Sequence, residues 1–187
     1  GTNAQIMAWM SEEYAKLTGA WEPAAFTGKP VEIGGSQGRE EATGLGGAAI
    51  LRGALGAIGK KRKLRIAIQG TGSVGGIIAE ELAKAGHVIV GLADSKGAVF
   101  AADGLDVQKL LAAKEEMGKP LAELAGKHAA ISNAELLEAD VDVLVPAALE
   151  SVITAENAGR IKASVILEMA NGPITAEADM ILAGRDV

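Results

Sequence analysis

A glycine-rich segment between an apolar strand and a helix constrains this sequence more than any other feature. Residues 70–75 read Gly-Thr-Gly-Ser-Val-Gly, which matches the pattern G-x-G-x-x-G. The apolar residues 64–68 before this segment predict a strand, and residues 74–85 after it have the periodicity of a helix. In a chain with 25 glycines the pattern alone would be weak evidence. Its position between a strand and a helix makes it typical of the first βα unit of a dinucleotide-binding fold.

Each part of this segment has a physical reason. Gly70 permits the tight turn from strand to helix, Gly72 lets the backbone approach a pyrophosphate, and Gly75 lets the helix pack closely on the strand. The helix N-terminus offers free N–H donors and the positive end of the helix dipole to phosphates. We therefore expect the pyrophosphate of a dinucleotide to be bound by Gly70, Thr71, Gly72, Ser73, Val74 and Gly75.

An acidic residue stands where such a fold reads the adenosine ribose. Asp94 follows the second predicted strand, residues 87–93, and its carboxylate can accept hydrogen bonds from the ribose hydroxyls. A carboxylate disfavours a 2′-phosphate at this position, whereas the following Ser95 and Lys96 favour one. The sequence therefore predicts NAD as the cofactor and leaves NADP open.

Strands and helices alternate through the rest of the chain. Further strands are expected at 129–132, 141–145 and 164–168, and further helices at 106–117, 133–138, 154–160 and 175–182. This rhythm predicts an α/β, Rossmann-like, doubly wound fold with a mostly parallel sheet and helices on both faces. Two earlier helices are expected at 4–18, capped by Asn3, and at 40–58. We expect a single dinucleotide-binding domain over residues 1–187, in which residues 1–60 pack on a core formed by residues 61–187.

Two more segments end strands at the edge of the sheet where open α/β folds bind ligands. Ala147 follows the strand 141–145, and we expect it to line the cofactor site. Asn171 follows the strand 164–168 and could donate to or accept from a nicotinamide carboxamide. A loop proline at 146 and a turn before Gly172-Pro173 explain the same residues without any ligand.

Composition excludes several other classes of function. The net charge of −6 argues against a nucleic-acid partner, which would require clustered Lys and Arg. No apolar run reaches the roughly 18 residues that cross a membrane. The sequence has no cysteine, which excludes disulfides and thiolate catalysis and is compatible with the cytoplasm. His87 and His128 stand far apart, and we expect no metal site.

Six short blocks stand along the chain in a fixed order: GTN at 1–3, TGKP at 27–30, GGSQGREEATG at 34–44, DSKG at 94–97, LVPAALE at 144–150 and ANGP at 170–173. Together they resemble the glutamate dehydrogenases of the Glu/Leu/Phe/Val dehydrogenase family, over essentially the whole chain. The block GREEATG is specific and argues against the sister leucine and phenylalanine dehydrogenases.

This resemblance implies a reaction and roles for three further residues. It implies NAD(P)-dependent oxidative deamination of L-glutamate to 2-oxoglutarate and ammonia by hydride transfer, in a cytoplasmic homo-hexamer. It implies a cofactor domain with one reversed strand. It matches Thr43 with a threonine that meets the nicotinamide carboxamide, Arg39 with an arginine at the cleft near the substrate, and Asn171 with an asparagine near both. Ser73 and Ser151 depart from the family, which usually has asparagine at both positions.

The resemblance also implies that the catalytic lysines and aspartate of the family lie in another domain. We therefore expect no catalytic residue in this chain, which looks like the excised middle of a longer enzyme and would bind only the cofactor. The selectivity for the substrate side chain would then also lie outside it. Two alternatives stay open, a stand-alone nucleotide-sensing module and another amino-acid dehydrogenase.

Overall fold

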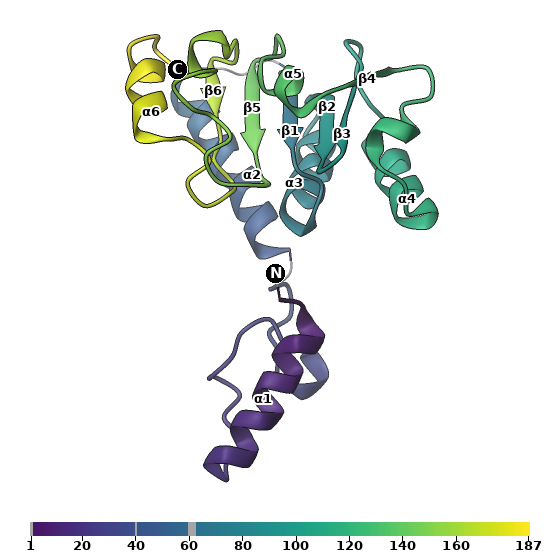
Figure 1. Ribbon diagram of the computed structural model, residues 1–187, viewed down its shortest axis with the longest axis vertical. Coiled ribbons are helices and arrows are strands. Elements are labelled where there is room, and N and C mark those ends of the chain that lie inside the picture. Colours follow the sequence, from purple (N-terminus) through teal and green to yellow (C-terminus); the bar gives the residue numbers. More distant parts are fainter. Residues whose placement is uncertain (1, 40, 60–62) are drawn as a thin grey trace. The chain divides into compact units, whose positions relative to one another are not determined.

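The computed structural model describes residues 2–39, 41–59 and 63–187 (Figure 1). The chain divides into two compact units, Gly1–Thr43 and Gly44–Val187. We expected a single domain over residues 1–187 with the first 60 residues packed on it. The boundary between the two units falls inside the helix expected at 40–58, and the single domain over residues 1–187 stays a prediction.

The N-terminal unit contains the helix α1 (Ala4–Thr18) and a short 3₁₀ helix, η1 (Val31–Ile33). The predicted cap is confirmed, because Asn3 Oδ1 accepts a hydrogen bond of 3.0 Å from the amide of Ile6. The connection between the two helices is irregular, as its Gly and Pro content predicts. The buried ammonium of Lys29 donates to two backbone carbonyls of this connection, those of Pro23 and Phe26.

The second unit is built on a six-stranded sheet with the order β4-β3-β2-β1-β5-β6 (Figure 1). The strands are β1 (Arg65–Gln69), β2 (Val88–Asp94), β3 (Gly97–Phe100), β4 (Ala129–Ile131), β5 (Val143–Pro146) and β6 (Val165–Ile166). β1 pairs in parallel with β2 and β5, and β5 pairs in parallel with β6. β3 pairs antiparallel with both of its neighbours, so it is the one described strand that runs in the opposite direction.

The reversed strand corrects the element prediction, because we expected no strand at residues 97–100. Ser95 and Lys96 form the turn between β2 and β3, and Gly97 follows with a φ of 144°. A connection this short forces β3 to run back beside β2, since a parallel strand would need a crossover of a dozen residues or more. A reversed strand is what the family resemblance implies, and β3 is that strand.

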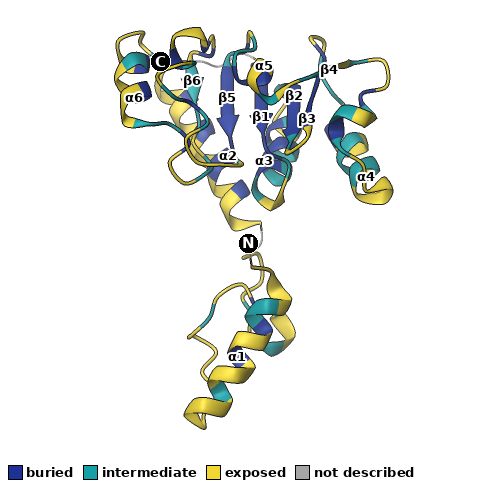
Figure 2. Ribbon diagram, in the orientation of Figure 1, coloured by how far each residue is buried: buried dark blue, intermediate teal, exposed yellow. Residues whose placement is uncertain are grey.

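Helices cover both faces of the sheet, as predicted. On one face lie α2 (Ala42–Ala57), α3 (Ser73–Lys84), α4 (Val107–Met117) and the 3₁₀ helix η2 (Leu121–Leu124), packed against the apolar side chains of β1 that include Ile66 and Ile68. On the other lie α5 (Asn133–Leu137), α6 (Ala176–Ala183) and the 3₁₀ helix η3 (Ala158–Arg160), packed against a cluster that includes Ala67. Figure 2 shows the central strands as the most deeply buried part of the unit. None of the helices described is long and apolar enough to cross a membrane.

The small residues of α2 allow this helix to pack tightly on the unit. Leu51 and Leu55 are buried in the cluster around β1. A Cβ added at Gly44 would stand 2.7 Å from the side chain of Ile77, and one at Gly47 would stand 2.4 Å from that of Met169. Close packing therefore explains the glycines that lower the helix propensity of this segment.

The helix expected at residues 154–160 is wrong in part, because only η3 forms there. The side chain of Asn157 bonds to the backbone instead: its Oδ1 accepts from the amide of Thr154 at 2.8 Å, and its Nδ2 donates to the carbonyl of Val152 at 2.9 Å. Such local bonds offer the backbone an alternative to a helix.

Ser151, which follows β5, has a φ of 51°, in the left-handed region of backbone conformation. Asparagine adopts this conformation more readily than other residues with a Cβ, for which it costs about 1–2 kcal/mol. We expect Ser151→Asn to raise the melting temperature by about 2–4 °C in thermal unfolding of the chain. Ser151→Ala is the matched control and should give no gain. Equal melting temperatures for the Asn and Ala variants would contradict the strain at this position.

Candidate functional site

The glycine-rich loop lies between β1 and α3, as predicted, and two of its glycines are required by close backbone contacts. A Cβ at Gly75 would stand only 1.8 Å from the carbonyl oxygen of Gly70. Gly70 itself has a φ of 100°, and a Cβ there would stand 2.9 Å from the carbonyl oxygen of Ala147. The loop is therefore fixed between the start of α3 and the segment that follows β5.

The third glycine of the loop faces open space. Gly72 is the N-cap of α3, and a Cβ built on it would have no atom within 4 Å. A glycine offers no side-chain acceptor to the first amides of the helix, which have no partner within the helix itself. Ser73, the first residue of the helix, is exposed. This arrangement fits a phosphate, because it combines free N–H donors, a positive helix dipole and room for the ligand to approach the backbone.

Asp94 ends β2 beside this loop, where the sequence places it. Its side chain is 10% exposed. Oδ1 accepts a hydrogen bond of 2.8 Å from the amide of Lys96, and Oδ2 accepts one of 2.8 Å from the amide of Leu121. A carboxylate offers about four acceptor positions, so positions remain for the hydroxyls of a ribose. Through its hydrogen bonds to the amides of Lys96 and Leu121, Asp94 also holds the β2–β3 turn and η2 in place. The sequence does not reveal this role.

Lys114 of α4 is a site residue that sequence reasoning missed. Its ammonium donates a hydrogen bond of 2.8 Å to Thr71 Oγ1 and lies 3.7 Å from Asp94 Oδ2. It joins the glycine-rich loop to the acid at the end of the next strand. Thr71 and Asp94 are distant in sequence, and only a tertiary contact between α3 and α4 brings the lysine to them. The sequence therefore carries no local signal for this role.

The segments after β5 and β6 meet at the same edge of the sheet. The amides of Met169 and Ala170 both donate to the carbonyl of Pro146, at 2.9 and 3.1 Å. Asn171 comes directly after these residues and is exposed, and Ala147 is half-buried beside Gly70. The structure thus brings the predicted Ala147 and Asn171 segments together.

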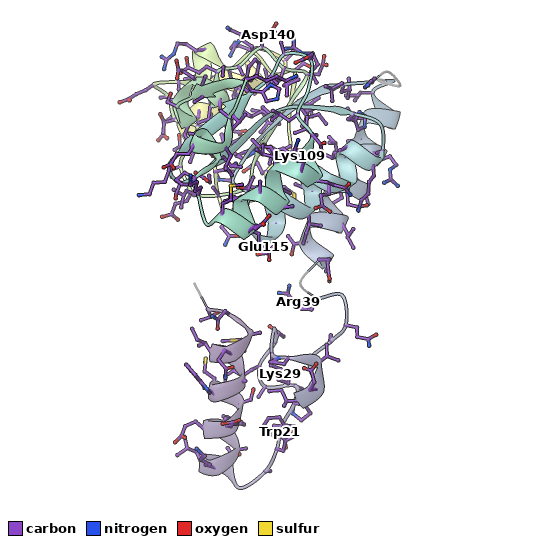
Figure 3. All side chains as sticks on the ribbon, turned by 90° about the vertical axis from the view of Figure 1, so that its right-hand side faces the viewer. Trp21, Lys29, Arg39, Lys109, Glu115 and Asp140 are labelled. Atoms are coloured by element: carbon purple, nitrogen blue, oxygen red, sulfur yellow. The ribbon has the colours of Figure 1, made fainter. Side chains whose placement is uncertain are left out.

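Arg39 and Thr43 belong to the N-terminal unit. Arg39 is exposed in a turn before α2 (Figure 3), and Thr43 is exposed in the first turn of α2. Glu40, in the same sequence block, lies outside the described residues. The expected place of Arg39 and Thr43 at a cleft stays a prediction.

The histidine at the opposite end of β2 is a structural acceptor. His87 Nδ1 accepts a hydrogen bond of 3.3 Å from the amide of Leu64. Burial, followed by the nearby charge of Arg52, lowers the pKa of His87 below its usual value, so the imidazole stays neutral and able to accept. Across the part of the chain that the structure describes, no group of His, Cys, Asp and Glu could hold a metal ion.

The sequence of this chain is similar to those of a known dehydrogenase family. The profile of the Glutamate/Leucine/Phenylalanine/Valine dehydrogenase family matches residues 34–187. The chain is 45% identical to a glutamate dehydrogenase of Thermotoga maritima over 100% of its length. It is also 45% identical to an NADP-specific glutamate dehydrogenase of Saccharolobus shibatae and 43% identical to the catabolic NAD-specific glutamate dehydrogenase RocG of Bacillus subtilis. The chain spans 45%, 44% and 43% of the lengths of these three relatives, which is less than half.

Solved structures give the same result for the fold. A hetero-hexameric glutamate dehydrogenase of Thermus thermophilus matches 99% of this chain with a TM-score of 0.90 and 33% identity. The glutamate dehydrogenase of Peptoniphilus asaccharolyticus matches 100% of it with a TM-score of 0.75 and 36% identity. In each case the chain covers 43% of the matched structure.

Gly72 faces open space and Gly75 is packed against backbone, so substitution by alanine should affect binding at the first and folding at the second. Gly72→Ala should leave folding nearly unchanged, because its Cβ meets no atom, but should weaken dinucleotide binding at least about tenfold by blocking the pyrophosphate. Gly75→Ala should lower the free energy of unfolding by about 1–3 kcal/mol or more, because its methyl group overlaps the backbone of Gly70. Thermal unfolding and calorimetric titration with NAD measure the two effects. Full NAD affinity in a folded Gly72→Ala chain would contradict a pyrophosphate at this loop.

Proposed function

This chain belongs to the Glutamate/Leucine/Phenylalanine/Valine dehydrogenase family, and from that premise we propose that it is the dinucleotide-binding part of a glutamate dehydrogenase. The observation that carries the proposal is the open N-terminus of α3 at Gly72, with Asp94 close to it. Gly72 leaves room for a ligand, whereas Gly70 and Gly75 are packed against the backbone. This difference supports a loop that binds a pyrophosphate.

The residues of this chain would hold and orient the cofactor. Residues 70–75 would bind the pyrophosphate through backbone amides, and Asp94 would accept hydrogen bonds from the adenosine ribose beside Ser95. Ala147 and Asn171, at the carboxyl ends of β5 and β6, would line the nicotinamide half. The bound dinucleotide supplies the hydride acceptor or donor of the reaction.

The whole protein would interconvert L-glutamate and 2-oxoglutarate plus ammonia. In this proposal Thr43 meets the nicotinamide carboxamide, and Arg39 lies at the cleft near the substrate. Hydride transfer requires the reacting carbon of the substrate to be held against the nicotinamide, and part of that geometry would come from residues beyond this chain. The relatives, which are more than twice as long, support this division of roles.

We also propose an oligomeric state, a cofactor choice and a cellular compartment for the intact enzyme. A hexamer is the expected assembly, and the hetero-hexameric Thermus thermophilus enzyme supports it. The relatives include NAD-specific and NADP-specific enzymes, which supports binding of NAD with NADP as a second cofactor. We place the enzyme in the cytoplasm, with no nucleic-acid or membrane partner.

We expect the isolated chain to bind NAD and NADP without oxidising glutamate. The adenosine and pyrophosphate contacts come from one unit of this chain, so measurable affinity should survive. Affinity should be weaker than in the intact enzyme, because no second domain closes over the nicotinamide and excludes water. Calorimetric titration measures binding, and absorbance of reduced cofactor with saturating glutamate measures turnover.

Two outcomes would contradict this proposal in different ways. Turnover that follows the purified polypeptide through a final chromatography step would show that the chain carries the catalytic groups itself. A folded chain that binds neither dinucleotide at millimolar concentration would show that the glycine-rich loop is not a competent site. The Gly72→Ala chain serves as the matched control for specific binding at the loop.

A further inference from the structure

Gln69, the last residue of β1, has a buried side chain whose carboxamide oxygen lacks a hydrogen-bond partner. Three polar or charged side chains are buried in the part of the chain that the structure describes, those of Ser11, Lys29 and Gln69. The first two donate to backbone carbonyls. Gln69 Oε1 is covered and accepts no hydrogen bond from any described residue. A buried acceptor without a partner destabilises a fold, so this glutamine needs an explanation.

Gln69 lies at the point in the sheet where the chain connections change face. From β1 the chain crosses to β2 through α3 on one face, and it enters β5 from α5 on the other face. β1 stands between β2 and β5 (Figure 1). Open α/β sheets bind ligands at such a switch point, outside the carboxyl ends of the strands. Gln69 is the β1 residue at this edge, and it pairs in register with Pro146 of β5.

The packing of the sheet gives no reason for a polar side chain at this position. Side chains alternate along a strand, and Ile66 and Ile68 pack on the α3 side, so Gln69 shares the opposite face with Ala67. Its partner in β2, Ala93, belongs to the same apolar cluster as Ala67. A methionine would occupy this place without leaving an oxygen unpaired. The stability of the fold therefore does not explain the carboxamide.

The proposed path of the dinucleotide explains it. The pyrophosphate would lie at Gly72, and the adenosine ribose at Asp94 of β2, on one side of β1. The other half of the dinucleotide then extends to the opposite side of β1, over β5 and the following Ala147. We propose that Gln69 is a dinucleotide-binding residue whose carboxamide forms a hydrogen bond with the ribose of the nicotinamide half. This role rests on the proposed binding of a dinucleotide.

The two groups are complementary in their hydrogen bonding. The carboxamide has an acceptor oxygen and two N–H donors, and ribose hydroxyls both donate and accept. The amide can turn about χ3, which is a broad torsion in glutamine, so Oε1 can change direction without movement of β1. The backbone stays fixed, because the carbonyl of Gln69 accepts from the amide of Ala147 at 2.8 Å. A ligand hydroxyl would thus supply the partner that the fold does not.

Removal of the carboxamide should have opposite effects on stability and on binding. Gln69→Met keeps an unbranched side chain of similar length without the amide. We expect its melting temperature to rise by about 2–4 °C, because no acceptor is left unpaired. Its affinity for NAD should fall about fivefold, as for the loss of one hydrogen bond. Its affinity for ADP, which has the adenosine and pyrophosphate but no second nucleoside, should not change. Thermal unfolding and calorimetric titration measure these effects.

A matched control lies on the same face of the sheet. Leu144 of β5 pairs in register with Ala67 and packs in the same apolar cluster. Leu144→Met introduces the same side chain into this cluster and nearly conserves volume. It should leave the ratio of NAD affinity to ADP affinity unchanged. In the original chain, the side-chain amide resonances of Gln69 should shift on saturation with NAD and stay in place on saturation with ADP.

Distinct outcomes separate the role of Gln69 from the proposed function. A folded chain that binds neither NAD nor ADP contradicts the proposed function. Unchanged NAD affinity in Gln69→Met, in a chain that binds both ligands, overturns only the role of Gln69. An equal loss of NAD and ADP affinity also overturns it, and would mean that the residue only supports the glycine-rich loop after it. If Gln69→Met does not fold, the resonances of the original chain decide, because an NAD-saturated chain with an unshifted Gln69 amide overturns the role.

Discussion

The close approach of α3 to the end of β1 is the contact on which the rest of this site depends. Gly75 has no room for a Cβ because the carbonyl of Gly70 lies against it, and Gly70 has none because the segment after β5 lies against it. These contacts fix the direction of α3, whose N-terminus then points to the edge where the parallel strands end. Parallel pairing of β1 with β2 and β5 brings Asp94 and Ala147 to that same edge. The geometry of the proposed dinucleotide site is thus a consequence of how one helix packs on one strand.

The parts of the fold that local sequence determines could be predicted. The loop at 70–75, the strand before it and the cap Asn3 depend on neighbouring residues, and each is where the sequence places it. The strand at 97–100 was missed because four residues carry too little periodicity, and pairing with β2 and β4 stabilises them.

The remaining differences have one local cause and one tertiary cause. Only η3 forms within the helix expected at 154–160, because the side chain of Asn157 bonds to the backbone around it. The role of Lys114 was missed because α4 and the glycine-rich loop are joined only in the folded chain. The family resemblance added what local patterns could not, since it implied a reversed strand before any pairing was known. The roles of Arg39 and Thr43 also come from that resemblance and stay predictions.

The choice between NAD and NADP depends on few residues of such a domain. Relatives of this chain at 43% and 45% identity are named NAD-specific and NADP-specific. NAD and NADP differ only by the phosphate on the adenosine 2′-hydroxyl, so a preference between them must arise from groups around the adenosine ribose. In this chain the ammonium of Lys114 lies 3.7 Å from Asp94 Oδ2, and Lys96 follows Asp94 in the β2–β3 turn.

The most direct test of the account is the position of the dinucleotide on the folded chain. Amide resonances followed by NMR during titration with NAD report each backbone N–H separately. The account predicts the largest saturable shifts at Gly72, Ser73 and Val74, where the first turn of α3 would donate to the pyrophosphate, followed by Lys96 and Leu121, whose amides bind Asp94. Saturable shifts that leave the first turn of α3 unchanged and cluster elsewhere on the chain would contradict it.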